Sequence, residues 1–129
     1  MDKPISSIME NQVITVSLDD TVDRVEELMY SHKLSSLPVI DSEQNCFGVI
    51  SATDLSHFYA LKENPKAKRA WEVCTHKIVE VSPGISTREA AELMIKNKIH
   101  HLVISEHETI IGLVSSIDII EECLLKNNA

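Results

Sequence analysis

Two stretches of the chain share a pattern of residues that could hold a polar ligand. Residues 48–54 read Gly-Val-Ile-Ser-Ala-Thr-Asp, and residues 112–118 read Gly-Leu-Val-Ser-Ser-Ile-Asp. In each stretch an aliphatic strand ends in a serine, and an aspartate follows three residues later, where a helix should begin. The start of a helix offers unpaired backbone N–H groups and the positive end of the helix dipole, which favour an anion or a polar ligand. We therefore expect two binding places in this chain.

The side chains of these stretches suit a nucleoside. An ionised aspartate can accept hydrogen bonds from both hydroxyls of a cis-diol, which suits Asp54 and Asp118 to ribose. Ser51 and Ser115, with the backbone N–H groups of the helix starts, suit a phosphate or a second ribose contact. The same serine and aspartate pairs could also be capping boxes that satisfy helix N–H groups without any ligand. Their recurrence in both halves favours a ligand role, and a capping serine can still face a ligand.

The two stretches belong to an internal repeat. A shift of 65 residues superposes Val16-Ser17 on Val81-Ser82, and Glu27-Leu28-Met29 on Glu92-Leu93-Met94. After one deletion in the polar segment that precedes Gly48, the shift becomes 64 and superposes the two glycine-to-aspartate stretches. Two copies of this length are too few for a solenoid. We expect two similar halves related by a pseudo-twofold axis.

Each half is predicted to run strand, helix, strand, strand, helix. Apolar residues at helical spacing and alternating or continuous aliphatic runs support these elements. Ser86 and Glu89 form the sequence pattern of a capping box at the start of the first helix of the second half. The polar segment 62–69 is predicted to be a linker. The predicted elements are strand 13–16, helix 21–32, hairpin 37–40 with 46–50 and helix 53–61, then a helix after Ser86, hairpin 102–104 with 110–114 and helix 117–125.

Composition excludes several classes of protein. The 129 residues are 43% hydrophobic, which suits one domain with a real core, and a net charge of −8 provides no basic field for nucleic acid or an anionic membrane. The first residues show no leader pattern and no long apolar run follows, so a cytoplasmic location is expected. The three cysteines lack CxxC spacing, so reduced thiols are expected and no metal site. Without a Ser/His/Asp order, a P-loop or GxGxxG, we expect no enzyme and no catalytic residue.

The combined pattern resembles a tandem pair of cystathionine-β-synthase (CBS) motifs, the regulatory unit called a Bateman module. The resemblance rests on Leu37-Pro38-Val39-Ile40-Asp41, the repeated glycine-to-aspartate stretch, the Glu-Leu-Met helices and the β-α-β-β-α order. It implies one α+β (α/β) module over residues 1–129, with one motif at 5–61, a linker at 62–69 and a second motif at 70–125. The two motifs would pack by their sheets about the pseudo-twofold axis.

The resemblance also implies a non-catalytic sensor. Members of the family commonly bind an adenosine derivative such as AMP, ADP, ATP or S-adenosylmethionine in a cleft between the motifs, and signal through conformation or dimer arrangement. No cofactor beyond this regulatory ligand is expected, and the expected partners are a second copy of the chain and a regulated enzyme or transporter in trans. Backbone atoms near Thr15, Val16, Glu80 and Val81 would read the adenine edge. The alternative is an interaction module that dimerises without ligand and has vestigial clefts.

The two clefts are expected to differ in charge. In nucleotide-binding relatives a basic residue often meets phosphate at the position of His100 or His101, where the first half has Ser35-Ser36. Thr53 and Ile117 precede the aspartates, where phosphate-binding relatives often have a cation. The lack of these cations favours a ligand with few phosphates over ATP, or an empty site.

Overall fold

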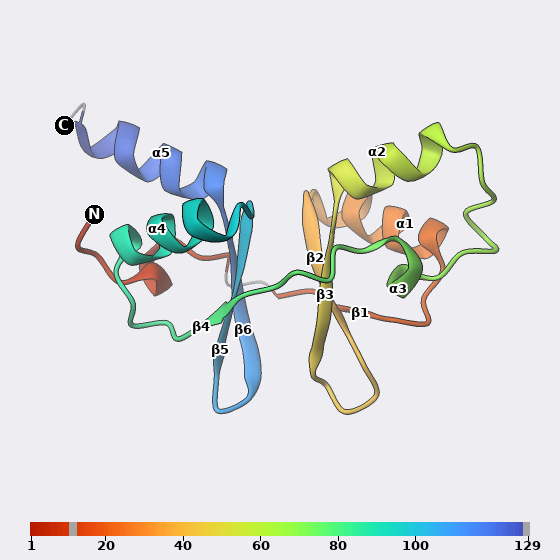
Figure 1. The fold of residues 1–129 in the computed structure, drawn as a ribbon, viewed down its shortest axis with the longest axis horizontal. Helices are drawn as coiled ribbons and strands as arrows, with labels where there is room; N and C mark the ends of the chain where they lie inside the picture. Colours follow the sequence, from red (N-terminus) through yellow and green to blue (C-terminus); the bar gives the residue numbers. More distant parts are fainter. Residues whose placement is uncertain (11–12, 128–129) are drawn as a thin grey trace. The chain divides into compact units, whose positions relative to one another are not determined.

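The computed structural model describes residues 1–10 and 13–127, including side chains up to residue 125 (Figure 1). Within it the chain divides into two compact units. The contiguous unit is Ile14–Lys77, and the discontinuous unit combines Met1–Val13 with Ile78–Ala129. These units do not coincide with the two predicted motifs, because each one takes in the first segment of the other motif.

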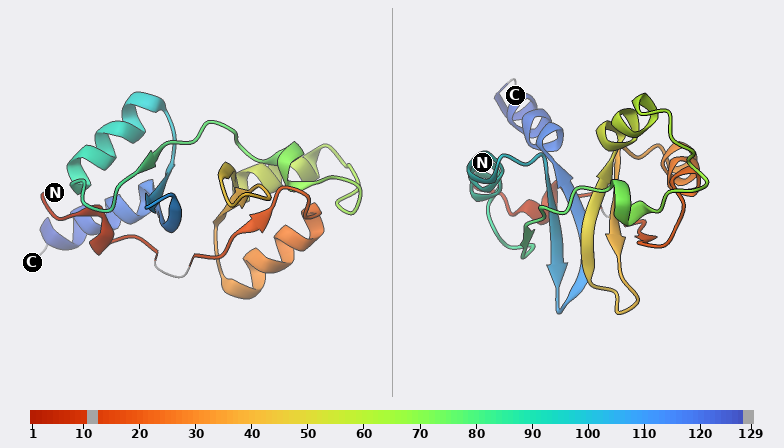
Figure 2. Two further views of the ribbon diagram at one scale, coloured as in Figure 1. Left: turned by 90° about the horizontal axis from the view of Figure 1, so that it is seen from below. Right: turned by 45° about the vertical axis from the view of Figure 1, so that its right-hand side comes forward.

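The contiguous unit is a three-stranded sheet with helices on one face (Figure 1). The strand order is β1-β2-β3, with β1 parallel to β2 and β2 antiparallel to β3. Helices α1 and α2 lie on the same side of this sheet in both views of Figure 2. The elements are β1 (Val16–Ser17), α1 (Val22–His32), β2 (Ser36–Ile40), β3 (Cys46–Ser51), α2 (Ala52–Ala60) and the short helix α3 (Ala70–Val73).

The discontinuous unit repeats this topology. Its strand order is β4-β5-β6, again with one parallel and one antiparallel pair. Helices α4 and α5 lie on one face of the sheet, and the N-terminal segment packs beside them (Figures 1 and 2). The elements are the 3₁₀ helix η1 (Ile5–Ser7), β4 (Glu80–Val81), α4 (Thr87–Asn97), β5 (His101–Glu106), β6 (Thr109–Ser115) and α5 (Ser116–Asn127).

The predicted hairpins and long helices occur where the sequence places them. The first strand is shorter than predicted and begins at Val16, because β1 pairs only with Val39 and Ile40 of β2. The predicted strand 13–16 directly follows residues 11–12, which lie outside the described residues. One half of the predicted capping box is present at α4: the Ser86 hydroxyl accepts a hydrogen bond from the Glu89 N–H at 3.1 Å, whereas the Glu89 carboxylate lies 3.4 Å from the Ser86 hydroxyl.

Each unit has its own aliphatic core under its helices. Val22, Val25 and Leu37 are fully buried in the contiguous unit, and Leu102 and Ile104 are fully buried in the discontinuous unit. The scarcity of aromatic residues in the chain means that burial of Val, Ile, Leu and Met supplies the hydrophobic stabilisation.

The first segment of each motif is held by backbone hydrogen bonds to the other motif. In the discontinuous unit the Ile5 N–H donates to the Ile85 carbonyl at 2.7 Å, and Ile5 is fully buried. In the contiguous unit the Ala70 N–H donates to the Asp20 carbonyl at 2.7 Å, and Ala70 is also fully buried. These two segments therefore belong structurally to the repeat that is distant in sequence.

Candidate functional site

The Asp54 carboxylate lies at the junction of β3 and α2, where it closes a capping box with Ser51. The Ser51 N–H donates to Asp54 Oδ2 at 2.9 Å, and the Asp54 N–H donates to Ser51 Oγ at 3.2 Å. The Ser51 hydroxyl also approaches Asp54 Oδ2 at 3.1 Å. The capping interpretation of this pair is therefore confirmed, and the pair is half-buried at the start of a helix.

Thr75 is the third residue at this carboxylate. Its hydroxyl donates to Asp54 Oδ1 at 3.1 Å, with Oδ2 at 3.4 Å. Thr75 is held there because it forms an isolated bridge with Val49, with backbone hydrogen bonds of 3.0 and 2.9 Å. Sequence reasoning missed this contact, since no local motif links Thr75 to a residue 21 positions earlier.

A cavity of about 480 Å³ adjoins Asp54. It lies in the contiguous unit, among α2, α3 and the segment that joins them. Its volume is within the range of about 300–1,000 Å³ that is usual for ligand pockets. The lining residues are Thr53, Asp54, His57, Phe58, Leu61, Glu63, Lys68, Glu72 and Val73.

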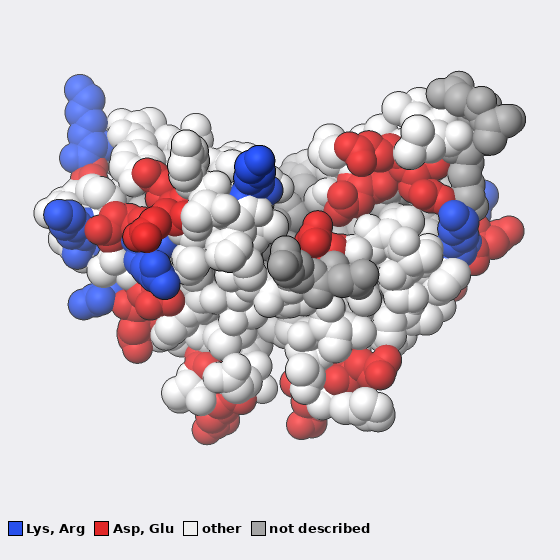
Figure 3. Space-filling model, turned by 180° about the vertical axis from the view of Figure 1, so that it is seen from behind, with Lys and Arg blue, Asp and Glu red and all other residues white. Residues whose placement is uncertain are grey.

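The charged residues of this cavity are mostly acidic. Asp54, Glu63 and Glu72 line it together with one lysine, Lys68, whose ammonium lies 3.9 Å from Glu63. His57 adds a group that is positive only when protonated. Because carboxylates outnumber the one lysine in its lining, the cavity is poorly suited to a ligand with several phosphates. Acidic side chains also gather at the two hairpin turns (Figure 3).

The Asp118 carboxylate occupies the equivalent place at the junction of β6 and α5. The Ser115 N–H donates to Asp118 Oδ2 at 2.8 Å, and the Asp118 N–H donates to Ser115 Oγ at 3.1 Å. Among the described residues, no hydroxyl outside the cap donates to this carboxylate. The two aspartates thus share their caps and differ in the third contact.

The predicted histidines lie near the Asp118 cap. His101 pairs with Ser115 across β5 and β6, as Ser36 pairs with Ser51 in the other hairpin. The preceding carbonyl, that of His100, accepts a hydrogen bond from the Ser116 N–H at 2.9 Å. Directly paired residues of an antiparallel ladder project from the same face, so His101 shares a face with Ser115. Contact of either histidine with phosphate stays a prediction.

Three of the four residues predicted to read adenine lie on the short strands β1 and β4, and Thr15 directly precedes β1. Val16 is buried and pairs with Val39, so its side chain belongs to the core. Glu80 is exposed and pairs with Val103, Val81 is half-buried in β4 and pairs with Ile104, and Thr15 is half-buried. Any contact to a ligand would come from their backbone, and this role stays a prediction.

Cys74 lies buried directly before Thr75. Burial, and then the charge of Asp54, raise the pKa of the Cys74 thiol to about 11. The thiol is therefore neutral at physiological pH and packs as a small apolar side chain. Among the described residues, no three His, Cys, Asp or Glu side chains gather as a metal site would require. None of the helices described has the length and apolarity to span a membrane.

Comparison with known families gives two matches within the chain. A family model described as "CBS domain" matches residues 5–61 and 70–125. An inosine-5'-monophosphate dehydrogenase from Methanocaldococcus jannaschii is 31% identical over 120 residues, which are 92% of this chain and 23% of that protein. The chain spans only 22% to 24% of the length of three such dehydrogenases.

Solved structures match over nearly the whole chain. A hexameric CBS-CP12 protein from bloom-forming cyanobacteria is 27% identical, with a TM-score of 0.87 over 95% of this chain and 72% of that one. A protein with CBS domains from Burkholderia ambifaria is 25% identical, with a TM-score of 0.83 over 95% of both chains. These similarities agree with the two three-stranded sheets and their helices.

Proposed function

The chain belongs to the CBS domain family as a tandem pair, a regulatory module, and on this premise we propose that it senses an adenosine-containing ligand. The observation that carries the proposal is the arrangement of Ser51, Asp54 and Thr75 beside the cavity of the contiguous unit. The two carboxylate oxygens can accept about four hydrogen bonds. Ser51 and Thr75 supply three donors, which leaves room for a ribose hydroxyl.

The charge of the cavity supports a ligand with little negative charge. The cavity has three carboxylates and one lysine. Its excess of negative charge repels the several phosphates of ATP more strongly than the single phosphate of AMP. S-adenosylmethionine, which carries a sulfonium and an ammonium group, also fits this charge. We therefore rank AMP and S-adenosylmethionine above ADP and ATP.

Sensing requires that the ligand prefer one arrangement of the module. A ligand shifts a conformational equilibrium only by its difference in affinity for the two states. The regulated protein would be an enzyme or transporter that contacts the module in trans, or a catalytic part of a longer polypeptide. The dehydrogenase relatives, of which this chain matches less than a quarter, make a regulated enzyme the first partner to test.

The test is titration calorimetry, supported by thermal shift, with AMP, ADP, ATP and S-adenosylmethionine. We expect the Asp54→Ala variant to lose the binding heat, because it removes the ribose acceptor. Glu43→Ala, which removes an exposed acidic residue in the turn between β2 and β3, is the matched control and should bind like the natural chain. Absence of binding heat for all four ligands would overturn the proposal.

A second candidate function, assembly with another copy of the chain, is supported by one face of α5. Ile117, Ile120 and Leu124 follow helical spacing, yet 58%, 51% and 57% of their surfaces are exposed. An apolar stripe of this kind is typical of an interaction surface. We propose that it mediates homodimerisation.

Sedimentation of the natural chain and of Ile120→Glu tests this assembly. The natural chain should dimerise and the variant should be monomeric, because a carboxylate would be buried in the apolar contact. Glu121→Gln on the same helix is the control and should leave the dimer unchanged. A natural chain that sediments as a monomer at all concentrations would contradict the assembly.

A further inference from the structure

We propose that the two aspartate sites are not equivalent, and that Glu10 excludes phosphate-bearing ligands from the Asp118 site while Thr75 admits them to the Asp54 site. This inference rests on the proposed function, because it assigns that ligand to one of two similar places. It makes Glu10 a residue that determines specificity.

Backbone pairing places Glu10 and Thr75 at equivalent positions. Thr75 forms an isolated antiparallel bridge with Val49, and Glu10 forms one with Leu113, to whose carbonyl the Glu10 N–H donates at 3.0 Å. Val49 and Leu113 each follow the glycine of the repeated stretch, and each precedes the site aspartate by five residues. The two crossing segments therefore meet their hairpins in the same register.

The same register fixes which face of the sheet the two side chains occupy. Paired residues of an antiparallel bridge project from the same face, and residues two apart along a strand share a face. Glu10 therefore lies on the face that holds Leu113 and Ser115. In the contiguous unit the corresponding side chain, Thr75, reaches the site carboxylate at 3.1 Å.

Between the two units, the neutral Thr75 hydroxyl corresponds to the anionic Glu10 carboxylate. The Thr75 hydroxyl donates to Asp54, whereas Glu10 and Asp118 are both acceptors when ionised and cannot hydrogen-bond each other. The exposed Glu10 brings a carboxylate to the register at which the Asp54 site has the neutral Thr75, so a phosphate beside the crossing segment would meet an added negative charge. Glu63 and Glu72 of the Asp54 cavity come instead from α3 and the segment before it, where Lys68 lies 3.9 Å from Glu63. His101 shares the face of Glu10 through its pairing with Ser115.

Calorimetric titration at pH 8 with AMP and with adenosine tests the inference. The natural chain should bind one AMP per chain, Asp54→Ala should abolish this binding, and Asp118→Ala should leave it unchanged. Glu10→Thr should add a second AMP site, or strengthen a weak second site by about tenfold or more. Adenosine, which lacks a phosphate, should gain much less from the substitution.

Two controls separate charge from shape and from folding. Glu10→Gln keeps the size of the side chain and removes its charge, so it should reproduce most of the gain of Glu10→Thr. Circular dichroism melting of each ligand-free variant checks that the fold is kept, as expected because the Glu10 side chain is exposed.

The outcomes distinguish this inference from the proposed function. If no variant binds AMP or adenosine, the inference fails, and the proposed function fails with it only if ADP, ATP and S-adenosylmethionine also give no binding heat. If the natural chain binds two AMP molecules with equal affinity, or loses AMP on Asp118→Ala and keeps it on Asp54→Ala, the ligand proposal stands and the assignment to Asp54 is wrong. An unchanged stoichiometry and second-site affinity in both Glu10 variants would also overturn the role of Glu10.

Discussion

Among the individual residues, Gly48 is required by the segment that crosses it. A Cβ atom at this position would lie 2.6 Å from the Thr75 carbonyl oxygen and 2.8 Å from the Cys74 sulfur. The oxygen belongs to a backbone that is paired with Val49, so it cannot move away cheaply. The absence of a side chain at Gly48 therefore lets the Thr75 backbone pair with Val49. This pairing brings the Thr75 hydroxyl to Asp54.

We expect Gly48→Ala to lower the free energy of unfolding by about 2 kcal/mol or more, because the methyl group overpacks this crossing. Chemical denaturation of the whole chain measures the effect. Gly84→Ala is the matched control, because a Cβ there meets no atom within 4 Å, and it should change stability by less than about 0.5 kcal/mol. Equal losses in the two variants would contradict the steric explanation.

Cys74 gives the stability a dependence on alkaline pH. Its thiol has a pKa raised to about 11 in the fold, mainly by burial, from an ordinary value of 9.0. Between these values the unfolded chain releases the proton and the folded chain keeps it, so the stability falls as the pH rises from 9 to 11. The fall amounts to about 2–3 kcal/mol, because each tenfold change in proton affinity is worth about 1.4 kcal/mol.

The test is urea unfolding of the natural chain and of Cys74→Ala at pH 8, 9, 10 and 11. The variant should show a shallower decline, because the titrating thiol is gone. Tyr59, whose pKa burial and then Glu26 raise to about 12, adds a decline above pH 10 that both proteins share. Parallel pH profiles for the two proteins would show that Cys74 does not contribute.

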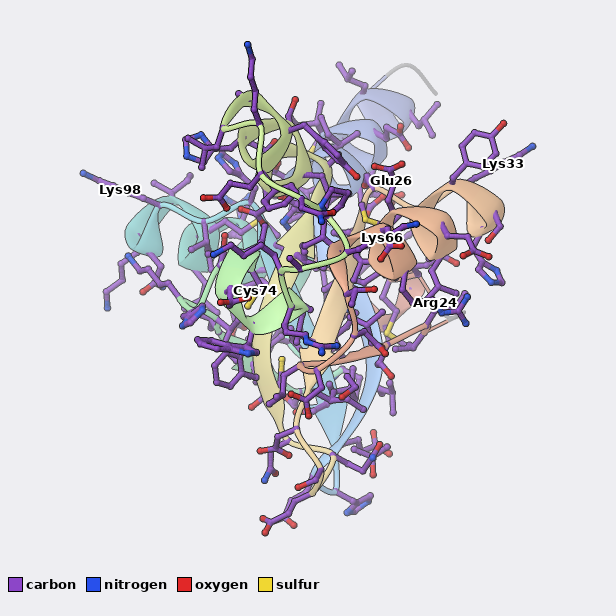
Figure 4. All side chains as sticks on the ribbon, turned by 90° about the vertical axis from the view of Figure 1, so that its right-hand side faces the viewer. Arg24, Glu26, Lys33, Lys66, Cys74 and Lys98 are labelled. Atoms are coloured by element: carbon purple, nitrogen blue, oxygen red, sulfur yellow. The ribbon has the colours of Figure 1, made fainter. Side chains whose placement is uncertain are left out.

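Among the secondary-structure elements, α1 and α4 both end in a left-handed residue that is a lysine. Lys33 and Lys98 adopt left-handed backbone conformations, with φ of 56° and 54°. The next residues, Leu34 and Ile99, donate to carbonyls of the last helical turn at 2.9 and 3.0 Å, which closes the helix. Figure 4 labels both lysines, and their side chains point outward from the helix ends. Glycine is the residue that ordinarily occupies this position.

We expect Lys98→Gly to raise the free energy of unfolding by up to about 1 kcal/mol, because glycine adopts positive φ without steric cost. Thermal melting followed by circular dichroism measures this gain. Glu92→Gly, at an exposed position inside α4, should instead lower stability by about 1 kcal/mol. A loss of stability in Lys98→Gly as large as in Glu92→Gly would mean that the helix end does not favour glycine.

In the molecule as a whole, the boundaries of the compact units differ from those of the two motifs. The contiguous unit is Ile14–Lys77, and it contains α3, which begins the second motif in sequence. The Trp71 N–H donates to the Leu18 carbonyl at 3.2 Å, and Thr75 pairs with β3. A fragment that ends at residue 61 lacks all of these contacts.

We therefore expect fragment 14–77 to be more stable than fragment 1–61, although the second corresponds to a complete repeat. The expected difference comes from burial of Ala70 and Cys74 and from the backbone pairing of Thr75. Hydrogen exchange of the two purified fragments at the same pH and temperature is the measurement. Greater protection of the β2–β3 amides in fragment 1–61 would contradict the division into these units.

Much of the fold could be predicted from local sequence. Hairpins such as Leu37–Ile40 with Cys46–Ile50 follow from continuous aliphatic runs joined by a polar turn, and the serine and aspartate at residues 51 and 54 mark the start of α2. These signals are local because strand propensity, turn residues and helix caps each act within a few positions. Because the two halves of the chain are similar in sequence, elements predicted in one half could also be predicted at the equivalent positions of the other half.

Local patterns of residues were thus enough to predict the elements, the tandem repeat and the two capped aspartates. The folded chain was needed to show that Thr75 meets Asp54, that Glu10 takes the equivalent place beside β6, and that the cavity of Lys68 and Glu72 adjoins one aspartate. The physical reason is that these contacts depend on how segments distant in the sequence cross the hairpins. Such crossings are fixed by backbone pairing and by the close approach at Gly48 and Gly112, and leave no local pattern in the chain.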